Sequence, residues 1–115
     1  MPDTRKTALV TGSTSGIGLA IARGFAKAGM NVMLNGLGDA VEIEKLRSDL
    51  AADTGVEVRF DGANLMDPHE VTRLVEATEA AFGRLDVLVN NAGIQFVSPI
   101  EDFPIEKWNA IQQLD

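Results

Sequence analysis

The sequence has 115 residues, of which 45% are hydrophobic, a proportion typical of one packed globular domain. It contains no cysteine, which excludes disulfides and thiolate metal sites, and its formal net charge of -7, without a basic cluster, argues against nucleic acid and membrane surfaces as partners. No apolar stretch is long enough for a membrane span or a signal sequence, so we expect a cytoplasmic protein with a small-molecule substrate.

The first predicted elements are a strand and a helix. Residues 7–10 form a short apolar run that ends at a turn, as expected for a strand buried on both faces of a parallel sheet. In the following helix Ile17, Ile21 and Phe25 are spaced by four residues, which predicts one buried stripe. Gly29 stands where a left-handed C-terminal cap is expected.

A second strand, a helix and a third strand come next. Residues 31–35 are the second strand, which a glycine-containing loop at residues 36–38 closes. Residues 57–60 are the third strand. Between them, residues 40–52 form a charged amphipathic helix whose apolar residues are Val41, Ile43, Leu46 and Leu50.

The third helix has a clear start signal. Asp67 is the predicted cap, Pro68 the first helical residue, and Glu70 the partner of Asp67 in a capping box. Residues 85–90 are a fourth buried strand, and a last helix is expected to begin near Pro104. The buried stripe of the third helix comprises Val71, Leu74, Val75 and Phe82.

This alternation of strands and helices predicts an α/β fold, a doubly wound parallel sheet of the Rossmann type, since crossovers between parallel strands are right-handed. We expect its four strands in the order 3-2-1-4. In that order the fourth strand would leave residues 87–89 as an unpaired apolar edge, which predicts dimerisation or aggregation.

A glycine-rich turn follows the first strand. Gly12, Gly16 and Gly18 allow a tight turn and bring the backbone close to a pyrophosphate at the start of a helix. The Lys and Ser or Thr that a P-loop needs after its last glycine are absent, which argues against Mg-ATP. The alternative is that these glycines only allow the helix to pack closely on the strand.

Together with Asn90-Asn91-Ala92-Gly93, this turn resembles the short-chain dehydrogenase/reductase family over nearly the whole chain. The resemblance implies that Asn90 ties the sheet together and that Asn91, Ala92 and Gly93 pass beside the ribose and nicotinamide of the cofactor. Taken alone, that segment could be ordinary turn residues. The glycine turn would supply the remaining front-half contacts, from Gly12, Thr14, Ser15, Gly16, Ile17 and Gly18.

The loop at residues 35–39 favours NAD over NADP. It contains no Arg or Lys for a 2'-phosphate, Leu37 would place an apolar wall near the 2'-position, and Asp39 would repel a phosphate. The usual acidic residue at the strand end is replaced by Asn35, so Asn35 or the backbone would hold the adenine ribose, and Asp39 is either a ribose ligand or only a helix cap. The resemblance places Asn64 at the adenine edge and Leu65 against the adenine ring.

Within the family the chain resembles the bacterial D-3-hydroxybutyrate dehydrogenases, which transfer hydride between 3-hydroxybutyrate and NAD and give acetoacetate. The resemblance implies that Gln95 hydrogen-bonds the substrate carboxylate; otherwise Gln95 is a polar loop residue. His69, at the start of a helix, is expected to be a solvated surface group, and no carboxylate cluster suggests a metal site.

Hydride transfer also needs a proton acceptor, and the family uses a Tyr, with a Lys four residues later and a Ser that orients the substrate. The sequence has no tyrosine, and Asp115 occupies the position of a family Asn, which puts a catalytic role for Asp115 in doubt. We therefore expect residues 1–115 to be the NAD-binding N-terminal part of one Rossmann-type domain, inactive alone and a homo-oligomer in its full-length form. A non-catalytic NAD-binding or regulatory module is the alternative.

Overall fold

The computed structural model describes residues 4–91 and the backbone of residues 97–99. Strands and helices alternate along most of the chain, as predicted, and the termini of each element agree with the sequence pattern to within a few residues. The elements are β1 (Thr7–Val10), α1 (Gly16–Lys27), β2 (Asn31–Leu34), α2 (Ala40–Thr54), β3 (Val58–Phe60), α3 (Pro68–Phe82), β4 (Val87–Val89) and β5 (Val97–Pro99).

The strands form one sheet in the order β3-β2-β1-β4-β5. The first four are parallel: β1 pairs with β2 on one side and with β4 on the other, and β2 pairs with β3. This confirms the predicted 3-2-1-4 order and the α/β class. Because the carboxyl ends of parallel strands lie at the same edge of the sheet, the segments that follow β1, β2, β3 and β4 also lie along that edge.

Strand β5 corrects one expectation. It pairs antiparallel with β4, with Val89 opposite Val97 and Val87 opposite Pro99, so residues 87–89 are not an unpaired edge. The predicted dimerisation, which depended on that open edge, loses its basis. Sequence patterns did not indicate this strand, since three residues are too few to show an alternation and proline is uncommon in strands except at sheet edges, where β5 lies.

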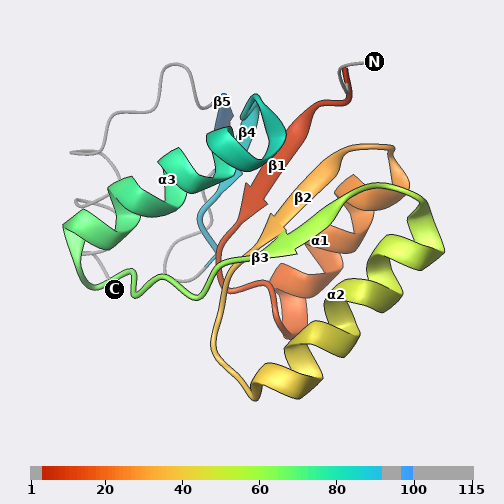
Figure 1. Cartoon of the computed structure of the whole chain (residues 1–115), viewed down its shortest axis with the longest axis horizontal. Coiled ribbons are helices and arrows are strands. Elements are labelled where there is room, and N and C mark those ends of the chain that lie inside the picture. Colours follow the sequence, from red (N-terminus) through yellow and green to blue (C-terminus); the bar gives the residue numbers. More distant parts are fainter. Residues whose placement is uncertain (1–3, 92–96, 100–115) are drawn as a thin grey trace.

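Helices cover both faces of the sheet (Figure 1): α1 and α2 lie on one face, and α3 lies on the other. Two successive residues of β1, whose side chains point to opposite faces of the sheet, show how each face is covered. Leu9 packs in a cluster with Leu74 and Phe82 of α3, whereas Val10 packs in a cluster with Ala22 of α1 and Leu50 of α2. Period-two alternation thus supplies apolar side chains to two separate core layers.

The helix faces differ in part from the predicted stripes. On α3 the prediction is confirmed, with Val71, Leu74 and Phe82 buried and Val75 packed against them. On α1 and α2, however, Ile17 is 67% exposed and Val41 is 78% exposed. The prediction that these two side chains belong to the apolar, buried faces of their helices is therefore wrong. Both are in the first turn of a helix at the edge where the strands end, beyond the sheet surface. The small residues Gly18, Ala22 and Ala26 are the buried face of α1.

Helix termini follow local rules with one exception. Gly55 and Gly83 end α2 and α3 in the left-handed conformation, and Gly29 has φ 91°, as predicted just after α1. Asp67 caps α3, but its side chain accepts a hydrogen bond from the backbone N–H of His69, and the predicted capping box does not form. The Glu70 carboxylate instead accepts hydrogen bonds from Arg73, which competes for it.

No helix within residues 4–91 is long and apolar enough to cross a membrane. The helix expected near Pro104 lies outside the described residues.

Candidate cofactor-binding site

The glycine turn links β1 to α1 at the carboxyl edge of the sheet. Gly12 and Gly16 have φ angles of 58° and 60°, a region that side chains with a Cβ rarely adopt. Ser13 between them is buried, and its hydroxyl donates to the carbonyl of Val10 at 2.7 Å. The turn therefore needs glycine at two positions for its backbone path alone.

Gly18 is required for a different reason. A Cβ at this position would overlap the carbonyl oxygen of Gly12 and lie 2.6 Å from Nδ2 of Asn91. By contrast, a Cβ at Gly16 would meet nothing within 4 Å. Helix α1 thus packs directly on the turn through Gly18, while open space lies beside Gly16 at the helix start.

The N-terminus of α1 is not capped by the residue at its cap position. Ser15 is at the cap position with an extended backbone, but its side chain makes no cap hydrogen bond, and the first turn contains no acidic residue. The first backbone N–H groups of a helix lack intrahelical acceptors and are at the positive end of the helix dipole. With the space beside Gly16, this arrangement fits the pyrophosphate of a dinucleotide.

The segment after β4 is attached to the same turn. The Thr11 hydroxyl donates to Oδ1 of Asn90 at 3.0 Å and accepts from the backbone N–H of Asn91 at 3.0 Å. Nδ2 of Asn91 donates to the carbonyl of Gly12 at 3.1 Å. Asn90 is fully buried and Asn91 is partly exposed, so the structure joins the two sequence motifs that are 79 residues apart.

The end of β2 is arranged differently from the expectation for Asn35. This residue is 1% exposed, and both N–H bonds of its amide are used: Nδ2 donates to the carbonyls of Asp61 at 2.9 Å and Ala63 at 3.2 Å. Its Oδ1 accepts from the backbone N–H of Gly12 at 3.4 Å. A side chain bonded in this way is unsuited to hold a ribose hydroxyl.

The following loop lies against the glycine turn. The Thr14 hydroxyl donates to the carbonyl of Leu37 at 2.9 Å, and a Cβ on Gly36 would lie 2.6 Å from that hydroxyl. Position 36 therefore has no room for an acidic or basic side chain. The side chain of Leu37 is 90% exposed, and Asp39 caps α2 by accepting from the backbone N–H of Glu42 at 3.1 Å.

The loop between β3 and α3 is held by charged groups. Arg73 donates to both carboxylate oxygens of Asp61, at 2.9 and 2.8 Å, and to Glu70 at 3.0 Å. These hydrogen bonds lower the pKa of Asp61 and raise that of Arg73, so both stay charged at neutral pH. Asn64 is exposed, its Oδ1 accepts from the backbone N–H of Met66, and Leu65 packs against the core beneath α3.

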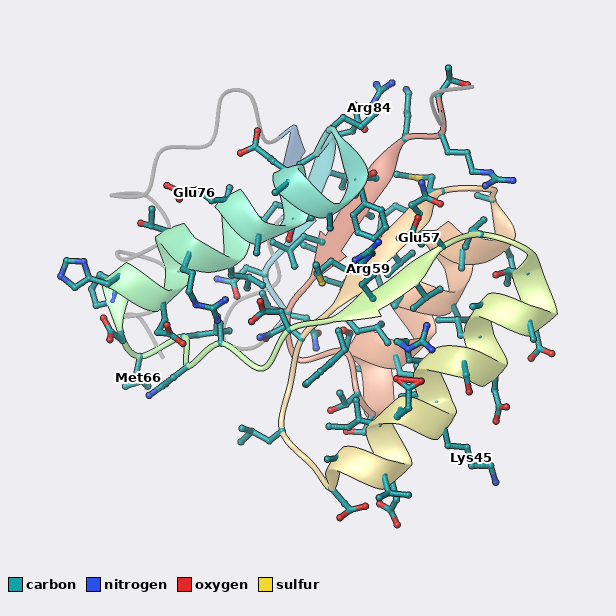
Figure 2. All side chains as sticks on the ribbon, viewed as in Figure 1. Lys45, Glu57, Arg59, Met66, Glu76 and Arg84 are labelled. Atoms are coloured by element: carbon teal, nitrogen blue, oxygen red, sulfur yellow. The ribbon has the colours of Figure 1, made fainter. Side chains whose placement is uncertain are left out.

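Another concave surface, of about 450 Å³, lies between α2 and β3 and is lined by Glu44, Arg47, Glu57, Val58, Arg59 and Phe60. Its charged groups are paired: Arg47 with Glu44 at 2.6 Å, and Arg59 with Glu57 (Figure 2). Arg47 also donates to the carbonyl of Val58 and so covers the exposed edge of β3.

Several predicted residues lie outside the described part of the chain: Ala92, Gly93, Gln95 and Asp115. Their assignments stay predictions. His69 is exposed, as expected. Sequence reasoning missed the structural bonds of Asn35 and the ion pairs of Arg73. A polar residue directly after an apolar strand was the available signal for Asn35, whereas nothing local marks Arg73 as the partner of Asp61.

Comparison with known proteins agrees with this geometry. A family model described as short chain dehydrogenase matches residues 6–115. Two curated relatives, both named D-beta-hydroxybutyrate dehydrogenase, from Rhizobium meliloti and Cupriavidus necator, are each 49% identical over 92% of this chain. The chain spans only 41% and 40% of their respective lengths.

Two solved structures are similar in fold. A short-chain dehydrogenase/reductase from Sinorhizobium meliloti has a TM-score of 0.73 and 37% identity, and the match covers 96% of this chain and 48% of that one. The L-sorbose reductase of Gluconobacter frateurii, solved with NADPH and L-sorbose, has a TM-score of 0.71 and 37% identity over 94% of this chain and 41% of that one.

Proposed function

Because this chain belongs to the short-chain dehydrogenase family, we propose that it is the NAD-binding part of an oxidoreductase that interconverts 3-hydroxybutyrate and acetoacetate. The observation that supports the binding role most directly is the uncapped start of α1 behind the glycine turn, with open space beside Gly16. A dinucleotide pyrophosphate supplies the negative charge that this helix start lacks. The names of the two hydroxybutyrate dehydrogenase relatives support the substrate class.

The loop after β2 supports NAD as the cofactor. Relatives of this fold include a reductase solved with NADPH, so family membership alone leaves both cofactors open. In this chain the close contact between Gly36 and Thr14 excludes a long side chain at position 36, and residues 35–39 contain no cation for a 2'-phosphate. The exposed Leu37 and the carboxylate of Asp39 both disfavour that phosphate.

When NAD is bound, it accepts or donates the hydride, and the residues of this chain bind and orient it. In this proposal the turn at residues 12–18 contacts the pyrophosphate, Asn64 and Leu65 contact the adenine, and residues 91–93 lie beside the ribose and nicotinamide. Gln95 would contact the substrate carboxylate. We propose that residues 1–115 together form the cofactor-binding part of one Rossmann-type domain.

Calorimetric titration of the chain with NAD and with NADP tests the cofactor proposal. We expect NAD to bind at least tenfold more tightly, a difference of about 1.4 kcal/mol. The variant Leu37→Arg should narrow or reverse this ratio, because a guanidinium beside the 2'-position pairs with a phosphate. Equal affinities for the two cofactors in the unaltered chain would contradict the assignment, and binding of neither would contradict the whole proposal.

We further propose that the 115-residue chain binds NAD without oxidising 3-hydroxybutyrate, since it contains no tyrosine to accept the hydroxyl proton. The absorbance of NADH, followed in the presence of NAD and 3-hydroxybutyrate, should not rise above that of the protein-free control. A rise that disappears in the Gly16→Trp variant, which fills the space beside the helix start, would refute this.

A further inference from the structure

The amide of Asn35 joins the carboxyl ends of three strands. Its Oδ1 accepts from Gly12 in the turn after β1, and its Nδ2 donates to Asp61 and Ala63 after β3. Its own backbone is bound equally firmly: the carbonyl accepts from the N–H of Ser13 at 2.6 Å, and the N–H donates to the Ser13 hydroxyl at 3.1 Å.

These two attachment points belong to different parts of the proposed site. The turn that begins at Gly12 faces the pyrophosphate, and Ala63 directly precedes Asn64, the proposed adenine contact. We propose that Asn35 is a positioning residue that fixes the spacing between the pyrophosphate turn and the adenine loop. This inference rests on the proposed nucleotide binding, which it deepens for the adenosine half of the cofactor.

An amide is the side chain that meets this need. Two carbonyl oxygens require two N–H donors, and one backbone N–H requires an acceptor, all from a single short side chain. A carboxylate of the same size offers acceptors only, and would place a negative charge against the carbonyls of Asp61 and Ala63. A serine offers one donor. The variants Asn35→Asp and Asn35→Ser therefore remove the bonds in two different ways.

The same strand offers a matched control. Asn31, at the opposite end of β2, is also 1% exposed, and its Oδ1 accepts from the backbone N–H of Glu57 at 3.0 Å. This end of the sheet is remote from the glycine turn. Asn31→Asp therefore introduces a comparable buried carboxylate without touching the proposed binding loops.

The measurement is the affinity for AMP, by calorimetry, between pH 5 and pH 8, on the folded fraction of each variant. At pH 8 we expect N35D to bind AMP at least tenfold more weakly than the unaltered chain. Relative to the unaltered chain at the same pH, much of the affinity should return toward pH 5, because the buried carboxyl of N35D has a raised pKa and donates one hydrogen bond once protonated. The AMP phosphate loses its second proton at about pH 6, which changes the affinity of all the proteins alike. The readout is therefore the ratio of each variant's affinity to that of the unaltered chain at the same pH, and for N31D this ratio should stay constant.

The neighbouring charged groups do not imitate this pH profile. The turn at residues 11–16 contains no titratable side chain, and the Asp61 carboxylate stays ionised over this range because Arg73 lowers its pKa. A pH response confined to N35D therefore comes from position 35.

N35D with the AMP affinity of N31D at every pH would overturn the inference, since a merely structural asparagine would change stability alone. Should N35D not fold, N35S is the test. Its affinity should be several-fold below that of the unaltered chain, by the same factor at every pH, and an affinity equal to that of the unaltered chain would overturn the inference. An unaltered chain that binds neither AMP nor NAD would instead refute the proposed function, so the two failures are distinguishable.

Discussion

The three helix starts in the part of the chain that the structure describes are built in two ways. Helices α2 and α3 each begin with an aspartate cap, Asp39 and Asp67, and each has a glutamate in its first turn. Helix α1 begins with Ser15, whose side chain caps nothing, and it has no acidic residue in its first turn. All three helices follow strands at the same edge of one sheet.

This difference agrees with the proposed function, in which α2 and α3 have purely structural helix ends and α1 has a binding end. Negative charge at a helix N-terminus stabilises the helix dipole by about 0.3–1 kcal/mol, and α2 and α3 obtain it from their own side chains. Helix α1 forgoes that stabilisation and leaves its N–H groups available to an external anion. A change at the start of α1 can therefore raise stability while it lowers cofactor affinity, whereas a change at the start of α2 or α3 should alter stability alone.

The largest effect is expected from Gly18→Ala, which disrupts the close packing of α1 against the glycine turn. The added Cβ overlaps the Gly12 carbonyl, so the free energy of unfolding should fall by about 3 kcal/mol and NAD affinity should be lost. Denaturant unfolding and calorimetric titration measure the two effects.

Gly24→Ala is the matched control in the same helix. A Cβ there meets nothing within 4 Å, so this variant should gain about 0.5–1 kcal/mol from better helix propensity and keep its NAD affinity. If Gly18→Ala unfolded no more easily than Gly24→Ala, the close packing of α1 on the turn would be contradicted.

An intermediate effect is expected from Ser15→Asp, which gives α1 the kind of start that α2 and α3 have. Stability should rise by up to about 1 kcal/mol, because the carboxylate caps the helix and complements its dipole. NAD affinity should fall about tenfold, roughly 1.4 kcal/mol, through repulsion of the pyrophosphate. Thermal unfolding and NAD titration at low salt measure the two opposed changes.

Ser15→Asn is the control for that variant, since it can cap the helix without adding charge. It should keep most of the NAD affinity. A tenfold loss in S15N as well would mean that the serine itself, and not the absence of charge, matters for binding.

The smallest effect on binding is expected from Asp39→Ala. The loss of the cap hydrogen bond to Glu42 should lower stability by about 1 kcal/mol, while the affinity for NAD stays within about twofold. Stability comes from denaturant unfolding and affinity from titration. A tenfold loss of NAD affinity would instead identify Asp39 as a ribose ligand, and α2 would then resemble α1 in contributing to the site.

Much of this fold follows from patterns of neighbouring residues. The apolar runs, the helix periodicity and the capping signals at Asp67 and Gly29 placed the elements, because each depends on residues within a few positions of one another. Ile17 and Val41 show the limit of periodicity: a helical stripe extended into the first turn places a side chain beyond the sheet that should cover it. Strand β5 shows a second limit, because a three-residue strand has no sequence pattern from which its pairing with β4 could be predicted.

The sequence alone determined the parallel α/β order, the glycine turn and the family resemblance, since all of these depend on spacing along the chain. Only the tertiary structure decided what Asn35 and Gly18 do. The partners of Asn35 are 23, 26 and 28 positions away, and the atoms that crowd Gly18 include one from Asn91. Such roles exist only after the strands have brought their carboxyl ends together, because a hydrogen bond or a steric overlap depends on distance in space.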